Sequence, residues 1–286
     1  MSSIISAHGL TKRYGRTVAV DNIDIDIPPG RIVGLIGPNG AGKTSALKAI
    51  LGLATYEGEL SVLGKNPARE RAALMKEVCF IADVAVLPRW IRVHQLIEVT
   101  EKLHPGFSRE RCMQYLGKTK VRLDQKVKQL SKGMVTLLHL AIVSAIDAKL
   151  LVLDEPTLGL DIIHRKDFHA RLLDDYLDED RTILITTHQV EEVEHILTDL
   201  IFIKDGRIAL ESTMEDVQER FYAVDVEPEN VSEARRLAPI HETRIRGGQY
   251  QFMYDGVDRE TLRKLGETHI PRVADLFVAI MNGGES

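Results

Sequence analysis

The sequence predicts an α/β fold in which a three-layer core surrounds a largely parallel sheet. Short apolar runs at Leu150–Leu153 and Thr182–Thr186 end in polar residues, as buried parallel strands do in α/β proteins. A similar run, Arg31–Ile36, opens into a glycine-rich segment. Longer stretches with helical periodicity separate these runs. Because strands and helices alternate, we expect helices on both faces of one sheet.

The remaining elements of the first two thirds follow from local patterns. Three early segments look like antiparallel strands, with the alternation typical of one buried face: Ile4–Leu10, Ala19–Ile27 and Gly58–Val62. Helical periodicity predicts helices at Arg69–Lys76, Val93–Leu103, Gly133–Ile146 and Ile163–Leu177. These elements suffice for one large domain.

A smaller pattern starts after the predicted helix Thr213–Phe221. The expected elements are a strand at Ala223–Val226, a helix at Val231–Leu237, strands through Gly247–Tyr254, a helix at Asp258–Leu265 and a final helix near Val273–Met281. We place a domain boundary near residue 220, which gives a main domain, 1–220, and a small α+β C-terminal domain, 221–286. The alternative is that this tail packs as a decoration on the main domain.

Composition excludes several classes of protein. The chain has 286 residues, is 44% hydrophobic and 28% charged, and carries a formal net charge of −5. This charge argues against nucleic acid as a partner, because such binding rests on a basic surface. Cys79 and Cys112 cannot build a disulfide framework or a zinc site alone. No signal peptide or run of about 20 apolar residues is present, so we expect a cytoplasmic chain that does not span the membrane.

The glycine-rich segment Gly37-Pro-Asn-Gly-Ala-Gly-Lys-Thr44 matches the pattern G-x-x-x-x-G-K-[ST]. Its glycines let the backbone fold so that successive amides cradle phosphates, and the following helix adds its positive N-terminal end. Lys43 supplies a cation for the β- and γ-phosphates, and the Thr44 hydroxyl can ligate magnesium. Such a loop is shared by kinases, GTPases and ATPases.

Two adjacent carboxylates, Asp154 and Glu155, follow the apolar run Leu150–Leu153. The carboxyl ends of parallel strands are where an open sheet places its ligand crevice. Asp154 is suited to hold magnesium through water, and Glu155 to polarise the attacking water as a general base. The alternative is an exposed acidic turn after a strand.

With these motifs the chain resembles the ATP-binding subunits of the ABC transporter superfamily, over residues 4 to about 217. Tyr14 matches the aromatic residue that stacks on adenine. Leu130-Ser-Lys-Gly-Met134 stands at the signature site, where LSGGQ is the usual form. Leu158-Gly-Leu-Asp161 matches the loop that crosses between two subunits, and His188 matches the switch histidine.

The resemblance implies a P-loop NTPase core with an antiparallel β subdomain and a helical subdomain, roughly 84–147. It implies ATP and Mg²⁺ as cofactors. Glu155 and His188 are then the catalytic residues. The residues expected to bind ATP are Tyr14, Gly37, Pro38, Asn39, Gly40, Ala41, Gly42, Lys43, Thr44, Ser45, Ser131, Lys132, Gly133 and Asp161. The expected metal ligands are Thr44, Asp154 and Asp83.

The signature segment implies a dimer. Ser131 and the amide of Gly133 begin a helix and present an anion-binding end. In the family this end faces the γ-phosphate held by the other subunit, so ATP joins a head-to-tail dimer of the chain with itself or with a second ATPase. Lys132 replaces the usual second glycine and would bring another positive charge near the phosphates.

Two features depart from the family pattern. Asp83 stands where the family carries a glutamine; its carboxylate can offer oxygen to magnesium but adds negative charge beside Asp154 and Glu155. Met134-Val-Thr-Leu-Leu138 replaces the polar residues that usually begin the signature helix. Burial of this helix explains the change, and so does a partner surface.

The resemblance also implies a partner. Residues 84–92 correspond to the region that in relatives receives the coupling helix of a transmembrane permease, and Trp90, the one tryptophan, lies there. We expect Trp90 to contact the permease; the alternative is a core tryptophan. The segment Ala274–Met281 resembles the end of subunits that serve ABC-2 exporters, which favours export and a peripheral place at the inner face of the cell membrane. The alternative functions are a non-transport or a regulatory ABC ATPase.

Overall fold

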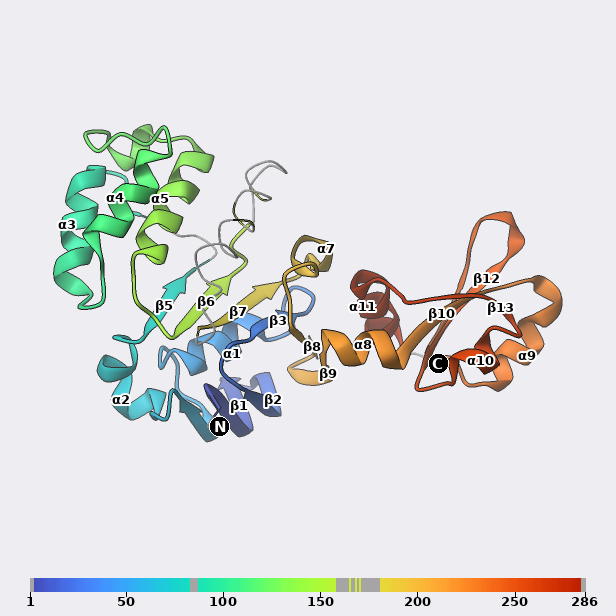
Figure 1. Cartoon of the computed structure of the whole chain (residues 1–286). Helices are drawn as coiled ribbons and strands as arrows, with labels where there is room; N and C mark the ends of the chain where they lie inside the picture. Colours follow the sequence, from blue (N-terminus) through green and yellow to red (C-terminus); the bar gives the residue numbers. More distant parts are fainter. Residues whose placement is uncertain are drawn as a thin grey trace.

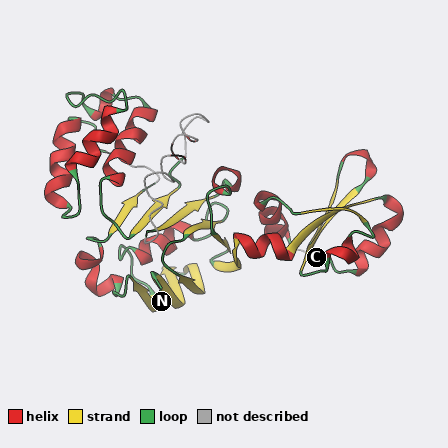
Figure 2. Ribbon diagram, viewed as in Figure 1, coloured by secondary structure: helices red, strands yellow, loops and turns green. Residues whose placement is uncertain are grey.

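The computed structural model describes residues 3–82, 87–157 and 181–283, together with residues 165, 168 and 170. The strands of these residues form three sheets. Two of them belong to a larger unit on the left of Figure 1, and the third lies on the right, beyond helix α8 (Met214–Arg220). Figure 2 shows the helices grouped around each sheet.

The central sheet positions the site. In the described residues its strand order is β5 (Val78–Ile81), β6 (Leu150–Asp154), β7 (Thr182–Thr187), β3 (Ile32–Ile36), β8 (Asp199–Lys204) and β9 (Arg207–Thr213). The pairs from β5 to β8 are parallel, and β9 runs antiparallel to β8. The predicted parallel arrangement of the three apolar runs is therefore confirmed.

A second sheet covers one side of the larger unit. Its strands are β2 (Thr17–Ile27), β1 (Ile5–Tyr14) and β4 (Glu57–Val62), and both pairings are antiparallel. This arrangement confirms the antiparallel layer expected from the early alternating segments. Helix α1 (Lys43–Ile50) lies between this sheet and the central one.

The other helices of the larger unit are α2 (Pro67–Leu74), α3 (Val93–Leu103), α4 (Arg109–Gly117), α5 (Lys132–Ser144) and the short α7 (Val190–Val193), with a 3₁₀ turn at Val127–Gln129. Helix α3 has the predicted bounds, whereas α4 was not predicted. Most of the predicted helix Ile163–Leu177 lies outside the described residues. No described helix is both long and apolar enough to cross a membrane.

Side-chain alternation along β6 explains the three layers. Leu150 and Val152 join an apolar cluster with α1 and the antiparallel sheet. Leu151 and Leu153 join another cluster with helices α3 to α5 on the opposite face. All four side chains are fully buried, as expected for a strand covered on both faces.

The third sheet has the order β11 (His241–Arg244), β12 (Tyr250–Asp255), β10 (Phe221–Val226) and β13 (Gly266–His269), with antiparallel pairs. Helices α9 (Val231–Arg236) and α10 (Arg259–Leu262) and 3₁₀ turns at Pro228–Asn230 and Arg246–Gly248 complete it. Strand β13 was not predicted. One apolar cluster belongs to this unit alone, between one face of the sheet and α9 and α10.

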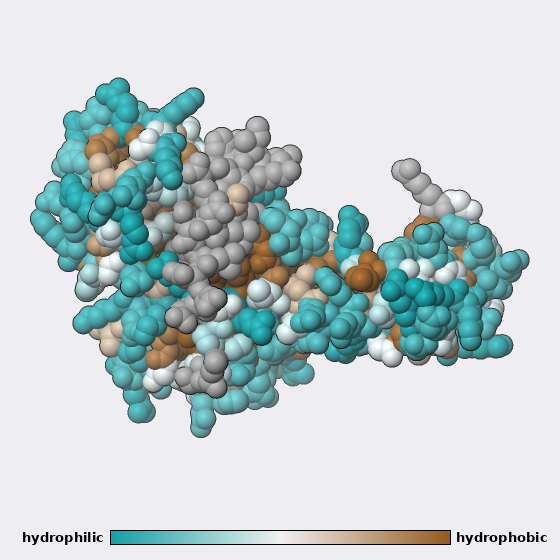
Figure 3. All heavy atoms as spheres, in the orientation of Figure 1, coloured by the Kyte–Doolittle hydropathy of each residue, from teal (hydrophilic) through white to brown (hydrophobic). Residues whose placement is uncertain are grey.

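The last helix, α11 (Val273–Asn282), returns to the larger unit. Its buried residues belong to the same cluster as Val190 and Val193 of α7. The Phe277 ring meets the edge of Phe202 at 5.2 Å between centroids. Figure 3 shows a largely hydrophilic face with apolar side chains visible where the two units meet. The domain boundary near residue 220 stays a prediction.

Candidate functional site

The phosphate loop runs from the end of β3 into α1, as predicted. Its glycines are required by close backbone contacts. A Cβ on Gly37 would lie 2.4 Å from the carbonyl oxygen of Ile203, and one on Gly42 would lie 2.3 Å from that of Ala19. Gly42 also has a φ of 109°, a value that other residues rarely adopt. The loop therefore folds tightly only with these glycines.

Lys43 lies at the first position of α1, with its ammonium folded back over the loop. Its Nζ donates to the carbonyl oxygens of Gly37 at 2.7 Å and Pro38 at 3.2 Å. The same Nζ lies 3.4 Å from Oε1 of Glu155. The cation is buried but retains three oxygen partners, so its charge is compensated.

Asp154 ends β6 and accepts hydrogen bonds from two threonines. The Thr44 hydroxyl donates to Oδ2 at 3.2 Å, and the Thr186 hydroxyl of β7 donates to Oδ1 at 2.5 Å. The parallel pairing of β6 with β7 places Thr186 directly beside Asp154. Thr44 and Asp154, which the sequence predicted as metal ligands, thus lie together.

Glu155 connects Lys43 with the predicted switch histidine. Its Oε2 lies 2.9 Å from Nδ1 of His188, while its Oε1 faces Lys43. The backbone of Glu155 has a φ of 47°, in the left-handed region. Its amide donates to the carbonyl oxygen of Thr186 at 3.0 Å and lies 3.3 Å from the Thr186 hydroxyl. The two predicted catalytic residues are therefore in direct contact.

A pocket of about 490 Å³ opens beside these groups, lined by Ala19, residues 39–45, Glu155 and His188. It brings most of the predicted phosphate-binding residues together with both predicted catalytic side chains. Tyr14 does not line it; the ring is 48% exposed at the end of β1, with Nζ of Lys12 at 4.7 Å from its centroid. Strand β2 supplies Ala19, so the β1–β2 hairpin borders the pocket.

The signature residues stand at the start of α5. Ser131 caps this helix, with its Oγ accepting from the amide of Met134 at 3.2 Å. Lys132 is exposed and Gly133 is buried. None of these three residues lines the nucleotide pocket of its own chain. Met134, Val135 and Leu137 pack against the core and Leu138 is fully buried, in agreement with the burial expected for this helix.

Two predicted residues cannot be placed. Asp83, the predicted metal ligand at the glutamine position, and Asp161, in the predicted crossing loop, both lie outside the described residues. Their roles stay predictions.

The oxygen donors around the loop fit a magnesium ion. Magnesium prefers hard oxygen ligands and usually takes only one or two from the protein, with the rest from phosphates and water. The Thr44 hydroxyl and the Asp154 carboxylate converge at the edge of the phosphate loop and provide such a pair. The described residues contain no cluster of three or more His, Cys, Asp or Glu side chains able to hold a metal by themselves.

Trp90 lies on the surface. Its side chain is 73% exposed, so the alternative of a core tryptophan is wrong. Backbone hydrogen bonds from Val127 to Ile91 and from Lys128 to Arg89 hold the segment that carries Trp90. Nearby, β5 and helices α3 and α5 border an apolar pocket of about 330 Å³, which Leu87 and His139 help to line. Burial lowers the pKa of His139 to about 4, so this imidazole is neutral at physiological pH.

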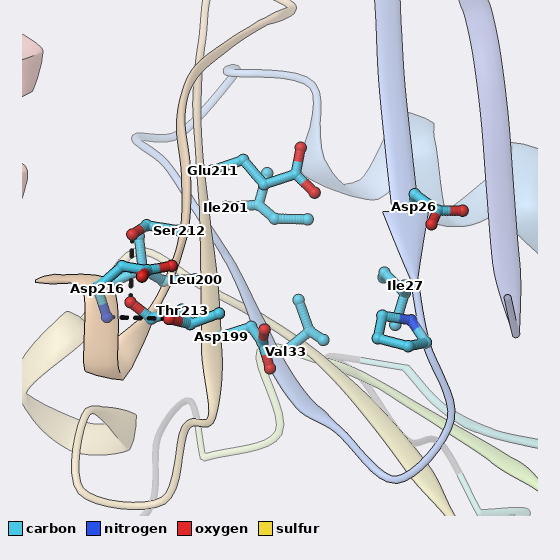
Figure 4. Close-up of a pocket in the computed structure, with 11 residues that line it drawn as sticks. Asp26, Ile27, Val33, Asp199, Leu200, Ile201, Glu211, Ser212, Thr213 and Asp216 are labelled. Carbon is cyan, nitrogen blue, oxygen red and sulfur yellow. Dashed lines mark hydrogen bonds between the residues drawn. The ribbon is translucent and has the colours of Figure 1, made fainter. Parts of the chain in front are cut away.

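A further pocket of about 200 Å³ lies between β2, β8 and β9, away from the phosphate loop (Figure 4). It holds several acidic side chains, with Asp26 across the pocket from Glu211. Although Glu211 is exposed on β9, desolvation of its carboxylate in the pocket, followed by the charges of Asp26 and Asp199, raises its pKa. Asp199 pairs with Arg31 at 3.8 Å, whereas the described residues that line the pocket include no cationic side chain.

The sequence analysis missed three polar residues that support the site. The hydroxyl of Thr186, in the largely apolar strand β7, donates a hydrogen bond to Asp154. Thr157 donates its hydroxyl to Oε2 of Glu192 at 2.7 Å, and Glu192 also pairs with Arg165. A threonine near the end of an otherwise apolar strand was the available signal for Thr186. Nothing in the sequence indicated the pairing of residues 157 and 192.

Comparisons with known proteins identify this arrangement. Residues 20–158 match the family model described as ABC transporter. The Nod factor export ATP-binding protein I of Cupriavidus metallidurans is 33% identical over 269 residues, covering 89% of this chain and 87% of the relative. The lantibiotic transport ATP-binding protein SrtF of Streptococcus pyogenes is 33% identical over 210 residues, covering 73% of this chain and 90% of the relative.

Solved structures share the fold. One described as an ATP binding subunit of an ABC transporter superposes with a TM-score of 0.68 at 22% identity, covering 76% of this chain and 92% of that one. The structure of cbiO1 from Clostridium perfringens, part of the transporter complex cbiONQ, gives 0.64 at 23% identity, covering 76% and 91%. The chain therefore belongs to the ATP-binding proteins of ABC transporters, an ATPase family whose members couple ATP hydrolysis to transport.

Proposed function

We propose that this chain is the ATP-hydrolysing subunit of an exporter, which binds ATP with magnesium, pairs with a second ATPase and drives a separate permease at the inner face of the cell membrane. The single observation that carries the hydrolytic part is the position of Glu155. Its carboxylate lies between Lys43 and His188 at the wall of the phosphate-loop pocket.

In this proposal the phosphate loop binds the nucleotide. The amides of residues 39–45 and the N-terminal end of α1 stabilise the phosphate oxygens. Lys43 exchanges its carbonyl partners and Glu155 for the β- and γ-phosphates, which are stronger partners for a buried ammonium. Nucleotide binding therefore releases Glu155 from its ion pair with Lys43. Ser45, which also lines the pocket, follows Thr44 at the same helix end and is assigned to the same phosphate-binding group.

The released carboxylate then acts on water. Glu155 accepts a proton from the attacking water. The water oxygen bonds to the γ-phosphorus, and the bond between this phosphorus and the oxygen that bridges to the β-phosphate breaks, which releases ADP. His188, at 2.9 Å from Oε2, orients this carboxylate and donates toward the γ-phosphate. Thr44 and Asp154 would hold magnesium, which neutralises charge on the phosphates when bound. Tyr14 would stack on adenine from the β1–β2 hairpin.

The pocket of one chain lacks the signature residues, and this supports a composite site. Ser131, Lys132 and Gly133 begin α5 away from the residues that line the pocket of their own chain. A helix start of this kind binds anions. In a head-to-tail dimer it meets the γ-phosphate in the pocket of the second ATPase, and Asp161 lies in the loop that crosses between the two chains.

The direction of transport is inferred from relatives. The Nod factor export ATP-binding protein matches this chain over 89% of its length, including most of the C-terminal unit. Export through a permease requires a contact on the ATPase surface. We assign this contact to the surface around the exposed Trp90, whose chain segment also supplies Leu87 to the apolar pocket between β5, α3 and α5.

The test of the hydrolytic role is Glu155→Gln. This change keeps the shape of the side chain and removes its basicity. We expect turnover to fall by on the order of 10³-fold or more, while ATP binding is retained, because the loop amides and Lys43 are unchanged. The measurement is phosphate release together with binding of a fluorescent ATP analogue.

The matched control is Glu219→Gln, the same change at an exposed position of α8. It should leave both readings at the wild-type level. Turnover by Glu155→Gln within a few-fold of the wild-type rate would refute the role assigned to Glu155 and favour a regulatory ATP-binding protein.

A further inference from the structure

We propose that Glu192 is a positioning residue for ATP hydrolysis: it holds the chain segments that carry Glu155 and His188 in register. The inference rests on the catalytic roles proposed for these two residues. Glu192 itself does not line the nucleotide pocket, so it acts through its neighbours and not on the substrate.

The carboxylate of Glu192 joins separate parts of the chain. Its Oε2 accepts the Thr157 hydroxyl at 2.7 Å, and its Oε1 pairs with the Arg165 guanidinium. Thr157 comes two residues after Glu155, and Glu192 comes four residues after His188. The bond between residues 157 and 192 therefore connects the stretches that leave the carboxyl ends of β6 and β7.

Together with the catalytic pair, this bond closes a ring. One link is the contact of His188 with Glu155 at 2.9 Å. The other is the bond of Thr157 with Glu192 at 2.7 Å. The backbone of β6 and β7 is also joined by the Glu155 amide, which donates to Thr186. The first link must change as the reaction proceeds, because both its members act on the γ-phosphate and the water. The second link takes no part in the chemistry and keeps the distance between the two stretches.

The burial of Glu192 supports a specific role. Its side chain is 9% exposed, and a carboxylate so little exposed is costly unless charged and hydrogen-bonding partners compensate it. Arg165 and Thr157 supply those partners. Val190 and Val193 of the same short helix are buried in the core. Helix α11 packs against this helix, and its cluster includes both valines. Glu192 is therefore held in place both by its side-chain partners, Thr157 and Arg165, and by the packing of α7 into the core.

The conformation of Glu155 makes such a support necessary. A φ of 47° is unfavourable for a glutamate, and such a residue persists only where its surroundings over-determine it. The fixed turn at Thr157 restrains the backbone that follows Glu155. Loss of the Glu192 bonds lets this turn relax and moves the Glu155 carboxylate away from His188 and the attacking water.

A displacement of this kind affects the reaction more than nucleotide binding. A shift of about 1 Å in a catalytic group costs on the order of 100-fold in rate. In the proposed function ATP is held by the loop between β3 and α1, in a pocket that Glu192 does not line. We therefore expect Glu192→Ala to lower kcat by about 10- to 100-fold and to leave KM for ATP within about twofold.

Three further variants separate positioning from general destabilisation. Thr157→Val removes the hydroxyl without changing the size of the side chain and should lower kcat as well. The double variant, Thr157→Val with Glu192→Ala, should have the same kcat as Glu192→Ala alone, because both changes break the same hydrogen bond between residues 157 and 192. Glu192→Gln keeps an oxygen for Thr157 but loses its charge toward Arg165, so its kcat should lie between those of the wild type and Glu192→Ala.

The matched control is Glu191→Ala, which removes the same charge from an exposed position one residue earlier. It should behave as the wild type. The proposal fails if Glu192→Ala keeps a kcat within twofold of this control, if its loss appears in KM instead, or if the effects of Thr157→Val and Glu192→Ala multiply. Glu155→Gln tests the catalytic assignment separately. If this variant kept its turnover, the catalytic role proposed for Glu155 would be refuted, whatever the result for Glu192.

Discussion

Glu155 combines the proposed reaction with a backbone conformation that costs about 1 to 3 kcal/mol. Its φ of 47° turns the chain directly after β6 and aims the side chain at Lys43 and His188. The hydrogen bond that the Glu155 amide donates to the carbonyl oxygen of Thr186, on the neighbouring strand, offsets part of this cost. Asn22, Leu63, Asp205 and Ala238 also have a positive φ, but among these residues Glu155 alone lines the phosphate-loop pocket, so there a strained backbone coincides with the proposed catalytic group.

Local residue patterns predicted this part of the site well. The glycines, Lys43 and Thr44 are close in sequence, and Gly37 and Gly42 are required by close backbone contacts of the loop. Asp154 and Glu155 follow from the end of a buried strand. The link between Thr157 and Glu192 could not be predicted, because these residues are 35 positions apart and meet only through the β6–β7 pairing. For Thr186, the one signal was a threonine near the end of an apolar strand.

Glu211 offers a residue-scale prediction about pH. Desolvation of its carboxylate, followed by the charges of Asp26 and Asp199, raises its pKa in the folded protein above the value of about 4.3 expected when unfolded. The ionised form therefore destabilises the fold, fully above the folded pKa and not at all below the unfolded one. Because Glu211 is exposed and solvent screens its charge, Glu211→Gln should raise Tm by no more than about 1 °C near pH 8, with the gain vanishing toward pH 4.

Thermal unfolding across this pH range is the measurement. The control is Glu59→Gln, at an exposed position of β4 outside the acidic pocket. A gain that is equal at both ends of the range, or a loss near pH 8, would contradict the ionisation cost assigned to Glu211.

At the scale of elements, segments with a clear apolar pattern were predicted, whereas segments with a weak or polar pattern were not. Helix α3 has enough turns for its apolar face to define its bounds. Helix α4 has a weaker apolar pattern, although Ser108 caps it and its side chain accepts from Arg111, which was a usable signal. Strand β13, Gly266–His269, has one polar residue after another and exists because β10 offers it an edge.

The segment that carries Trp90 gives the element-scale prediction. Because this side chain is 73% exposed, Trp90→Ala should change the free energy of unfolding by no more than about 0.5 kcal/mol. The loss of a proposed interface anchor should instead weaken co-purification with the permease and lower permease-stimulated ATPase activity, by tenfold or more if Trp90 contributes about 1.4 kcal/mol or more.

Leu103→Ala is the matched control, since this side chain is 77% exposed at the end of α3. It should assemble with the permease as the wild type does. A Trp90→Ala variant that assembles equally well and keeps coupled activity would remove Trp90 from the interface.

At the scale of the whole molecule, the C-terminal part of the chain contacts the helix that follows His188, the proposed catalytic histidine. Helix α11 belongs to the C-terminal part of the chain but packs against α7, which begins two residues after His188. Lys204 of β8 donates to the carbonyl oxygen of Met281 at 2.6 Å and ties the same helix to the central sheet. The sequence predicted the helix but not this return, because apolar residues alone do not specify which surface will cover them.

The composite site is the central claim, and the size of the chain in solution tests it most directly. Glu155→Gln binds ATP without consuming it, so ATP and magnesium should convert the 32.0 kDa chain into a dimer in light scattering after gel filtration. ADP should not, and Ser131→Ala should weaken the conversion. Hydrolysis by the wild-type chain, combined with a Glu155→Gln variant that remains monomeric at saturating ATP, would contradict the account.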